Sequence, residues 1–176
     1  MYILAVDQAR HGAWSVFEYE SKKLIAYGEF SFDEKKYTFP KAVLGIEALI
    51  SDVINAYNVS AVFIEGIQLR QNVKSFQRLA QLQGVLVNLF EKNEYLYDVI
   101  APSQWQNFCM ARGRSIKEIK SNLKEINSTT KKKSKVLSIQ AVKTLYGIDT
   151  ENDNLADAIL IGHYVVNNVP ITISKK

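Results

Sequence analysis

Carboxylate side chains stand at the ends of apolar stretches in this chain. Asp7 closes the first apolar run, and Glu65 closes a second one. Asp157 directly precedes a third run, and Asp153 lies four residues before it, a spacing that places both on one face of a helix. Because an isolated carboxylate is costly to remove from water, each of these acids needs a partner such as a cation.

Carboxylate oxygens suit Mg²⁺ or Mn²⁺, which keep several waters and complete their shells with substrate phosphate. Two such ions about 4 Å apart activate a water on one side of a phosphodiester and stabilise the leaving oxygen on the other. The sequence therefore predicts a two-metal site formed by Asp7, Glu65, Asp153 and Asp157. A simpler reading covers Asp153 alone, since an acid at a helix N-terminus is stabilising without any metal.

Other catalytic chemistries have less support in the sequence. Cys109, His11 and His163 lack the spacing of zinc ligands, and no serine nucleophile motif is present. The turn after Asp7 lacks the glycines and threonines with which actin-like ATPases wrap phosphate, and the chain is too short for the second domain of that class.

Hydrophobic periodicity predicts an α/β fold that brings the acids together. An antiparallel meander comes first, with strands at 2–7, 13–19 and 24–30. A helix at about 40–54 then leads to a strand at 61–65, which a helical crossover places parallel to the first strand. Asp7 and Glu65 are therefore expected at the same edge of the sheet.

The second half of the chain supplies further helices and one more strand. We expect a helix at 73–92, a strand at 96–100, a helix at 102–110 with Trp105 and Phe108 inward, a polar helix at 115–126, a helix at 135–145, and a helix that begins at Asn152 or Asp153. The helix at 73–92 has apolar residues on more than one face, so a second helix or subunit is needed to cover it.

The positive charge of the chain is concentrated in one segment. Between Arg112 and Lys143, ten Lys or Arg accompany two Glu, for a net charge of +8, whereas the remaining residues carry −4. This distribution predicts contact with a polyanion such as DNA, although lysines on a solvated surface would look the same. A DNA-binding module without catalysis needs no more than this segment, but acids without metal would repel DNA phosphates.

Length and composition indicate the number of domains and the cellular location. A chain of 176 residues is expected to form one domain, 1–176, with a basic insertion at about 112–133. Neither a run of about 18 apolar residues nor a secretory signal is visible, and the single cysteine cannot form an internal disulfide. We therefore expect a cytoplasmic protein without a membrane span.

Several short motifs resemble a known nuclease family. They are the strand-end Asp7, the Ile-Glu-Gly at 64–66, the Gln-Arg-Leu-Ala-Gln-Leu-Gln-Gly at 77–84, and the Asn-Leu-Ala-Asp-Ala at 154–158, followed by an apolar helix. Together they resemble the RuvC family of Holliday junction resolvases, in the RNase H-like superfamily, and in particular its phage-type branch. The resemblance covers the whole chain.

The resemblance implies a fold, a partner and an activity. The fold would be α/β and RNase H-like, with a mixed five-stranded sheet flanked by helices. The protein would be a homodimer, paired through the 73–92 helix, that binds four-way DNA junctions and other branched DNA such as forks. Each subunit would nick one strand with Mg²⁺ or Mn²⁺, two ions per active site. The alternatives are a branched-DNA-binding protein without catalysis and a ribonuclease that acts on RNA–DNA hybrids.

The resemblance also assigns residues. Asp7, Glu65 and Asp157 match the metal carboxylates of the family. The fourth position of the family falls on Asn154, which could contribute a neutral oxygen, and we assign the role to Asp153, one residue earlier. Lys133 matches a catalytic lysine, whereas Gln106 stands where the family has another and Gln68 where it has a base-stacking aromatic residue, which implies weak sequence preference. The expected DNA contacts are Arg70, Lys74, Arg112, Arg114, Lys131, Lys132, Lys133 and Lys135.

Overall fold

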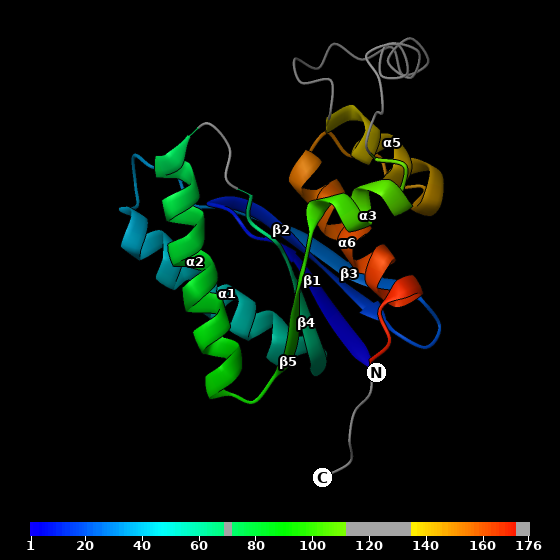
Figure 1. Ribbon diagram of the computed structural model, residues 1–176, viewed down its shortest axis with the longest axis horizontal. Helices are drawn as coiled ribbons and strands as arrows, with labels where there is room; N and C mark the ends of the chain where they lie inside the picture. The colour runs from blue at the N-terminus through cyan, green and yellow to red at the C-terminus, as the bar shows by residue number, and fades with distance from the viewer. Residues whose placement is uncertain (69–71, 112–134, 172–176) are drawn as a thin grey trace.

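A mixed five-stranded sheet forms the centre of the computed structural model (Figure 1). The structure describes residues 1–68, 72–111 and 135–171. The strands are β1 (Tyr2–Asp7), β2 (His11–Glu18), β3 (Lys23–Ser31), β4 (Val59–Glu65) and β5 (Leu96–Ile100), in the spatial order β3-β2-β1-β4-β5. The first three strands are antiparallel, while β4 pairs in parallel with both β1 and β5. This is the sheet that the apolar runs predict.

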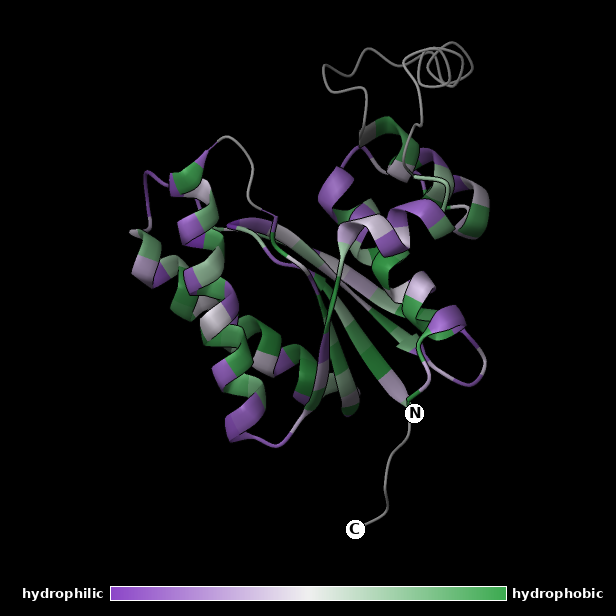
Figure 2. Ribbon diagram, viewed as in Figure 1, coloured by the Kyte–Doolittle hydropathy of each residue, from purple (hydrophilic) through white to green (hydrophobic). Residues whose placement is uncertain are grey.

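Helices cover both faces of the sheet. One face carries α1 (Phe39–Tyr57) and α2 (Val73–Lys92), and the other carries α3 (Pro102–Phe108), α5 (Lys135–Tyr146) and α6 (Asp153–Asn168) (Figure 1). Each face encloses its own hydrophobic cluster, so the central strands are apolar on both sides. Figure 2 shows this as green, apolar residues along the sheet and along α6.

The helix α6 is held tightly against β2. The hydroxyl of Ser15, which is fully buried, donates a 2.8 Å hydrogen bond to the carbonyl of Ala158. Gly162 comes so close to the strand that a Cβ there would lie 2.5 Å from the ring of Phe17. The absence of a side chain at 162 therefore lets the helix and the sheet make close contact.

Most of the expected elements are confirmed, with one error in packing. The helix after β5 ends at Phe108 rather than Met110, and Trp105 is fully buried as expected. Phe108 is 43% exposed, so its expected inward position is wrong. The helix has only seven residues, and Trp105 already occupies the side that faces the core. The polar helix expected at 115–126 and the basic insertion lie outside the described residues.

Candidate active site at the carboxyl ends of β1 and β4

The side chain of Asp7 lies on the face of the sheet that α6 covers. Along β1, Ile3 and Ala5 belong to the hydrophobic cluster under α6, while Leu4 and Val6 belong to the cluster under α1. Successive side chains of a strand point to opposite faces, so Asp7 follows Ile3 and Ala5. Its side chain is 8% exposed, although it ends the strand at the rim of the sheet.

Glu65 repeats this placement on the neighbouring strand. In β4, Ala61 and Phe63 belong to the cluster under α6, so Glu65 points to the same face as Asp7. The parallel register pairs Val6 with Ile64, which sets Asp7 beside Glu65 at the strand ends. The sequence-based prediction that these two acids share one edge of the sheet is confirmed.

Two neighbours hold Glu65 from either side of the sheet. The indole Nε1 of Trp105 donates a 3.0 Å hydrogen bond to Glu65 Oε1. From the opposite face, the buried amide of Gln8 donates through Nε2 to the backbone carbonyl of Glu65, at 2.8 Å, and to Gln83 Oε1 of α2, at 2.9 Å. Both the main chain and the carboxylate of Glu65 are thereby oriented.

Asp153 and Asp157 lie in the first turns of α6, which begins next to the start of β2. The side-chain amide of Asn154 donates to the carbonyl of His11 at 3.0 Å, and Asp7 pairs with Ala13 two residues further along that strand. The start of α6 and the end of β1 therefore approach the same rim on the same face of the sheet. Each of the four acids, Asp7, Glu65, Asp153 and Asp157, makes at least one hydrogen bond or electrostatic interaction.

The capping role that could explain Asp153 belongs to its neighbour. The Asn152 Oδ1 accepts hydrogen bonds from the backbone N–H groups of Asn154, at 3.0 Å, and Leu155, at 3.4 Å. Asn152 is therefore the N-cap of α6, and Asp153 is the first residue of the helix.

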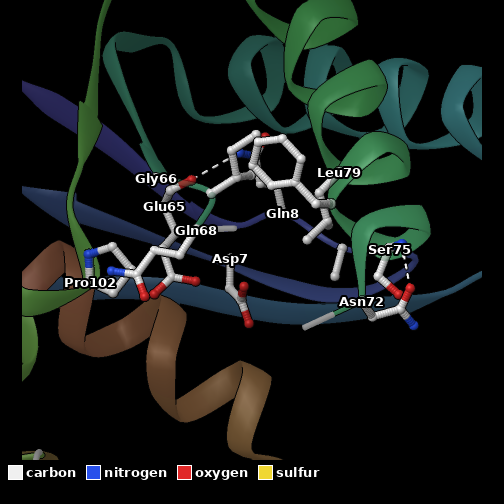
Figure 3. A pocket seen from close by; sticks show the side chains of 12 residues that line it. Asp7, Gln8, Glu65, Gly66, Gln68, Asn72, Ser75, Leu79 and Pro102 are labelled. Atoms are coloured by element: carbon white, nitrogen blue, oxygen red, sulfur yellow. Dashed lines mark hydrogen bonds between the residues drawn. The ribbon is translucent and has the colours of Figure 1, made fainter. Parts of the chain in front are cut away.

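A pocket of about 310 Å³ opens at this rim. Asp7, Glu65 and Gln68 line it on one side, and residues at the start of α2, among them Asn72 and Ser75, line the other (Figure 3). Asp153 and Asp157 are not among the lining residues. In the described part of the chain, no group of three or more His, Cys, Asp or Glu side chains is placed to hold a metal ion by itself.

The donors at this rim fit a hard divalent cation. The ligands on offer are carboxylate oxygens, and Mg²⁺ in proteins binds through one or two carboxylates while waters and substrate phosphates fill the remaining positions. The pocket beside Asp7 and Glu65 leaves room for such oxygens. The indole N–H on Glu65 is the kind of outer partner that orients a ligating carboxylate.

Most of the expected DNA contacts fall outside the described residues. These are Arg70, Arg112, Arg114, Lys131, Lys132 and Lys133. Lys74 is exposed in the first turn of α2, and Lys135 is the first residue of α5. Gln68 is exposed beside the pocket, so it lies near the acids without an aromatic ring to stack on a base.

His163, in α6, and Cys109, at the end of α3, take part in the packing of these helices. His163 Nδ1 lies 2.6 Å from the hydroxyl of Tyr146, and burial lowers the pKa of the imidazole below its ordinary value. Burial raises the pKa of the Cys109 thiol to about 12, which makes it a poor nucleophile. Neither residue lines the pocket that contains Asp7 and Glu65.

Sequence analysis missed the contributions of Trp105 and Gln8 to this site. Their partner, Glu65, lies 40 and 57 residues away in the chain. One signal was available for Trp105, because an indole N–H is only a donor and needs an acceptor when it is buried.

Comparisons with known proteins agree with this geometry. Residues 3–162 match the family described as crossover junction endodeoxyribonuclease RuvC. No protein of curated function matches the sequence. The solved structures that resemble the chain include RuvC of T. thermophilus in complex with Holliday junction substrate, with 14% sequence identity and a TM-score of 0.68, where the alignment covers 93% of this chain and 91% of that one.

One yeast resolvase and one viral resolvase share the fold. The yeast mitochondrial Holliday junction resolvase Ydc2 is 17% identical, with a TM-score of 0.55 and coverage of 93% of this chain and 77% of its own. The Fowlpox virus resolvase, solved with substrate Holliday junction DNA, is 18% identical, with a TM-score of 0.52 and coverage of 96% and 99%. These likenesses show an RNase H-like α/β fold. Because the family match spans most of the chain, this protein belongs to the RuvC family of crossover junction endodeoxyribonucleases, metal-dependent enzymes that resolve Holliday junctions.

Proposed function

We propose that the protein cleaves four-way and other branched DNA at the rim formed by β1, β4 and α6. Asp7, Glu65, Asp157 and Asp153 would hold two Mg²⁺ or Mn²⁺ ions, which supply an activated water and stabilise the leaving oxygen. The observation that carries this proposal is the position of Asp7 and Glu65, which end neighbouring parallel strands and point to the face on which α6 begins.

Neutralising one carboxylate tests the catalytic claim. Asp7→Asn and Glu65→Gln keep the shape of the side chain but remove the charge that a divalent ion needs, so cleavage should fall by at least a hundredfold while junction binding persists. Asp52→Asn is the matched control, because Asp52 is an exposed acid on α1, away from the rim. A Glu65→Gln enzyme that cuts at the wild-type rate would remove Glu65 from the site.

The substrate panel separates the competing activities. Labelled four-way junctions, forks, linear duplex and an RNA–DNA hybrid are incubated with the protein, with and without Mg²⁺. We expect paired nicks in the branched DNA only. Cleavage of the hybrid would support a ribonuclease, and binding of junctions without any metal-dependent cleavage would support a binding protein.

Basic side chains would hold the DNA arms. Lys74 is exposed at the start of the helix that borders the pocket, and Arg70 precedes it in the sequence. The basic insertion, with Arg112, Arg114, Lys131 and Lys132, would contact phosphates rather than bases, with Lys135 at its end. Lys133 would act at the scissile phosphate. The lack of an aromatic residue at Gln68 supports weak sequence preference.

A homodimer paired through α2 would cover the side of this helix that the fold leaves exposed. Only Leu82, Leu86 and Phe90 of α2 are buried, whereas Val73 is 57% exposed and the remaining apolar residues are partly exposed. We expect the α2 helix of a second subunit to cover these apolar residues. Sedimentation equilibrium measures this directly, and a monomer at micromolar concentration would contradict it.

The remaining proposals concern origin and organisation. The overall resemblance of the sequence is the ground for proposing the phage-type branch of the family. The chain would act as one domain, residues 1–176, in the cytoplasm of the cell in which it works. No helix of the described residues is long and apolar enough to cross a bilayer.

A further inference from the structure

We propose that Trp105 is a positioning residue for the reaction, and that its indole N–H fixes the carboxylate of Glu65 in the orientation that binds a divalent cation. This inference rests on the proposed metal-binding role of Glu65. It adds a residue that lies 40 positions away in the chain, on a different element, and that acts through Glu65.

The contact joins a rigid donor to the acid at the rim. Trp105 is fully buried in the cluster under α6, and its Nε1 lies 3.0 Å from Glu65 Oε1. An indole can donate but not accept, so it has one way to satisfy its N–H, and the surrounding core prevents the ring from turning away. The donor is therefore preorganised, and Glu65 is the flexible partner that it orients.

The element that carries Trp105 is itself fixed to the end of β4. Ile100 at the end of β5 pairs with Glu65, and the N–H of Gly66 donates to the carbonyl of Ile100 at 2.8 Å. The helix α3 begins two residues after Ile100, with Pro102 in its first turn, and Gln104 Oε1 accepts from the N–H of Ala101. This short, capped connection places the indole at a set height above the strand end.

The hydrogen bond engages one oxygen of the carboxylate. A donor at Oε1 restricts the rotation of the carboxylate plane, on a side chain that ends its strand beside Asp7. Outer partners of this kind typically change metal affinity or activity by about 10- to 100-fold when they are removed.

The first test is the metal dependence of Trp105→Phe. Phenylalanine keeps an aromatic ring in the core but has no N–H. The metal concentration at half-maximal cleavage should rise by about 10- to 100-fold, and excess Mn²⁺ should restore most of kcat. Trp14→Phe is the matched control, because Trp14 packs on the opposite face of the sheet, against Tyr57. A purely structural role would lower the thermal stability of Trp105→Phe and leave its metal dependence as in wild type, which would overturn the proposal.

The second test reads the contact without catalysis. Trp14 and Trp105 are the two tryptophans of the chain, so Trp14→Phe leaves Trp105 as the sole tryptophan, which excitation at the red edge of the absorption band separates from the nine tyrosines. Paramagnetic Mn²⁺ should quench its emission with a saturable dependence, and adding Glu65→Gln should abolish the effect. Isothermal titration calorimetry measures the affinity for Mn²⁺ independently. We expect wild type to bind most tightly, Trp105→Phe more weakly and Glu65→Gln most weakly.

The two proposals fail in different ways. If the wild-type protein shows neither saturable Mn²⁺ quenching nor metal-dependent cleavage, the proposed function falls. If it cleaves with metal but Glu65→Gln cuts at the wild-type rate, Glu65 is no ligand and the role of Trp105 falls with it. If the wild-type protein binds Mn²⁺ and cleaves, but Trp105→Phe binds Mn²⁺ with unchanged affinity, only the positioning role of Trp105 is wrong.

Discussion

Replacing Gly162 with alanine should destabilise the protein and weaken cleavage, although alanine is the better helix former. A Cβ at this position of α6 would lie 2.5 Å from Phe17 Cε2 and 2.9 Å from the hydroxyl oxygen of Ser15. Both partners are fully buried in β2 and have no room to withdraw. The helix itself must then move away from the strand.

The magnitude follows from two opposing effects. Inserting a methyl group into a well-packed core costs about 1–3 kcal/mol. Replacing glycine by alanine inside a helix returns about 0.5–1 kcal/mol. Because the Cβ would overlap two buried side chains, the cost lies in the upper part of its range, about 2–3 kcal/mol. The expected net loss is then about 1–2.5 kcal/mol, which lowers Tm by roughly 2–10 °C in a chain of this size. Asp52→Ala is the control, because Asp52 is an exposed position inside α1, where alanine should only improve helix propensity.

Cleavage should fall more than stability alone explains. The acids Asp153 and Asp157 belong to the same helix, so a displacement of α6 changes their positions relative to Asp7. Misplacement of catalytic groups by about 1 Å can cost about a hundredfold in rate, and a smaller shift should cost about tenfold. The rate is measured on a four-way junction, well below Tm, so that the folded fraction is the same in all variants.

A rescue experiment identifies the cause. Phe17→Leu removes the ring that the new methyl group meets, so Gly162→Ala should cost much less stability in that background than in wild type. Urea unfolding of the four proteins in this cycle measures the coupling. Wild-type stability in the single Gly162→Ala variant, or an equal cost in both backgrounds, would refute the steric reasoning.

Three further predictions follow from other parts of the molecule. Replacing Lys131, Lys132 and Lys133 with alanine should make junction affinity less dependent on salt, and an unchanged slope of log Kd against log salt would show that these lysines bind no phosphate. His163→Gln should flatten the pH dependence of stability below about pH 6.5. Burial holds the folded pKa of His163 below its ordinary value of 6.5, so its contribution is present above that pH and is lost as pH falls, as urea midpoints would show. If α2 forms the dimer, Gly84→Leu should raise the dimer dissociation constant by tenfold or more, measured by sedimentation.

The sequence alone was enough to predict the main helices and strands, and to predict that the acids lie at the ends of two strands and at the start of a helix. Apolar runs that close on Asp7 and Glu65 predict buried strands, because a strand covered on both faces has no polar side. The helical spacing of Asp153 and Asp157 is likewise a local property. Such signals depend on neighbours in the chain, so they are readable without the fold. The expected position of Phe108 was wrong because a short helix does not fix which residue reaches the core.

The tertiary structure decided which face each acid uses and what holds it there. The alternation of Ile3 and Ala5 against their neighbours has meaning only once α6 covers one side of the sheet. The bond from Trp105 to Glu65 joins residues 40 positions apart, and the one from Ser15 to Ala158 spans 143 positions. Contacts between distant segments depend on how the helices pack and on the space that Gly162 leaves, which no local pattern in the sequence specifies.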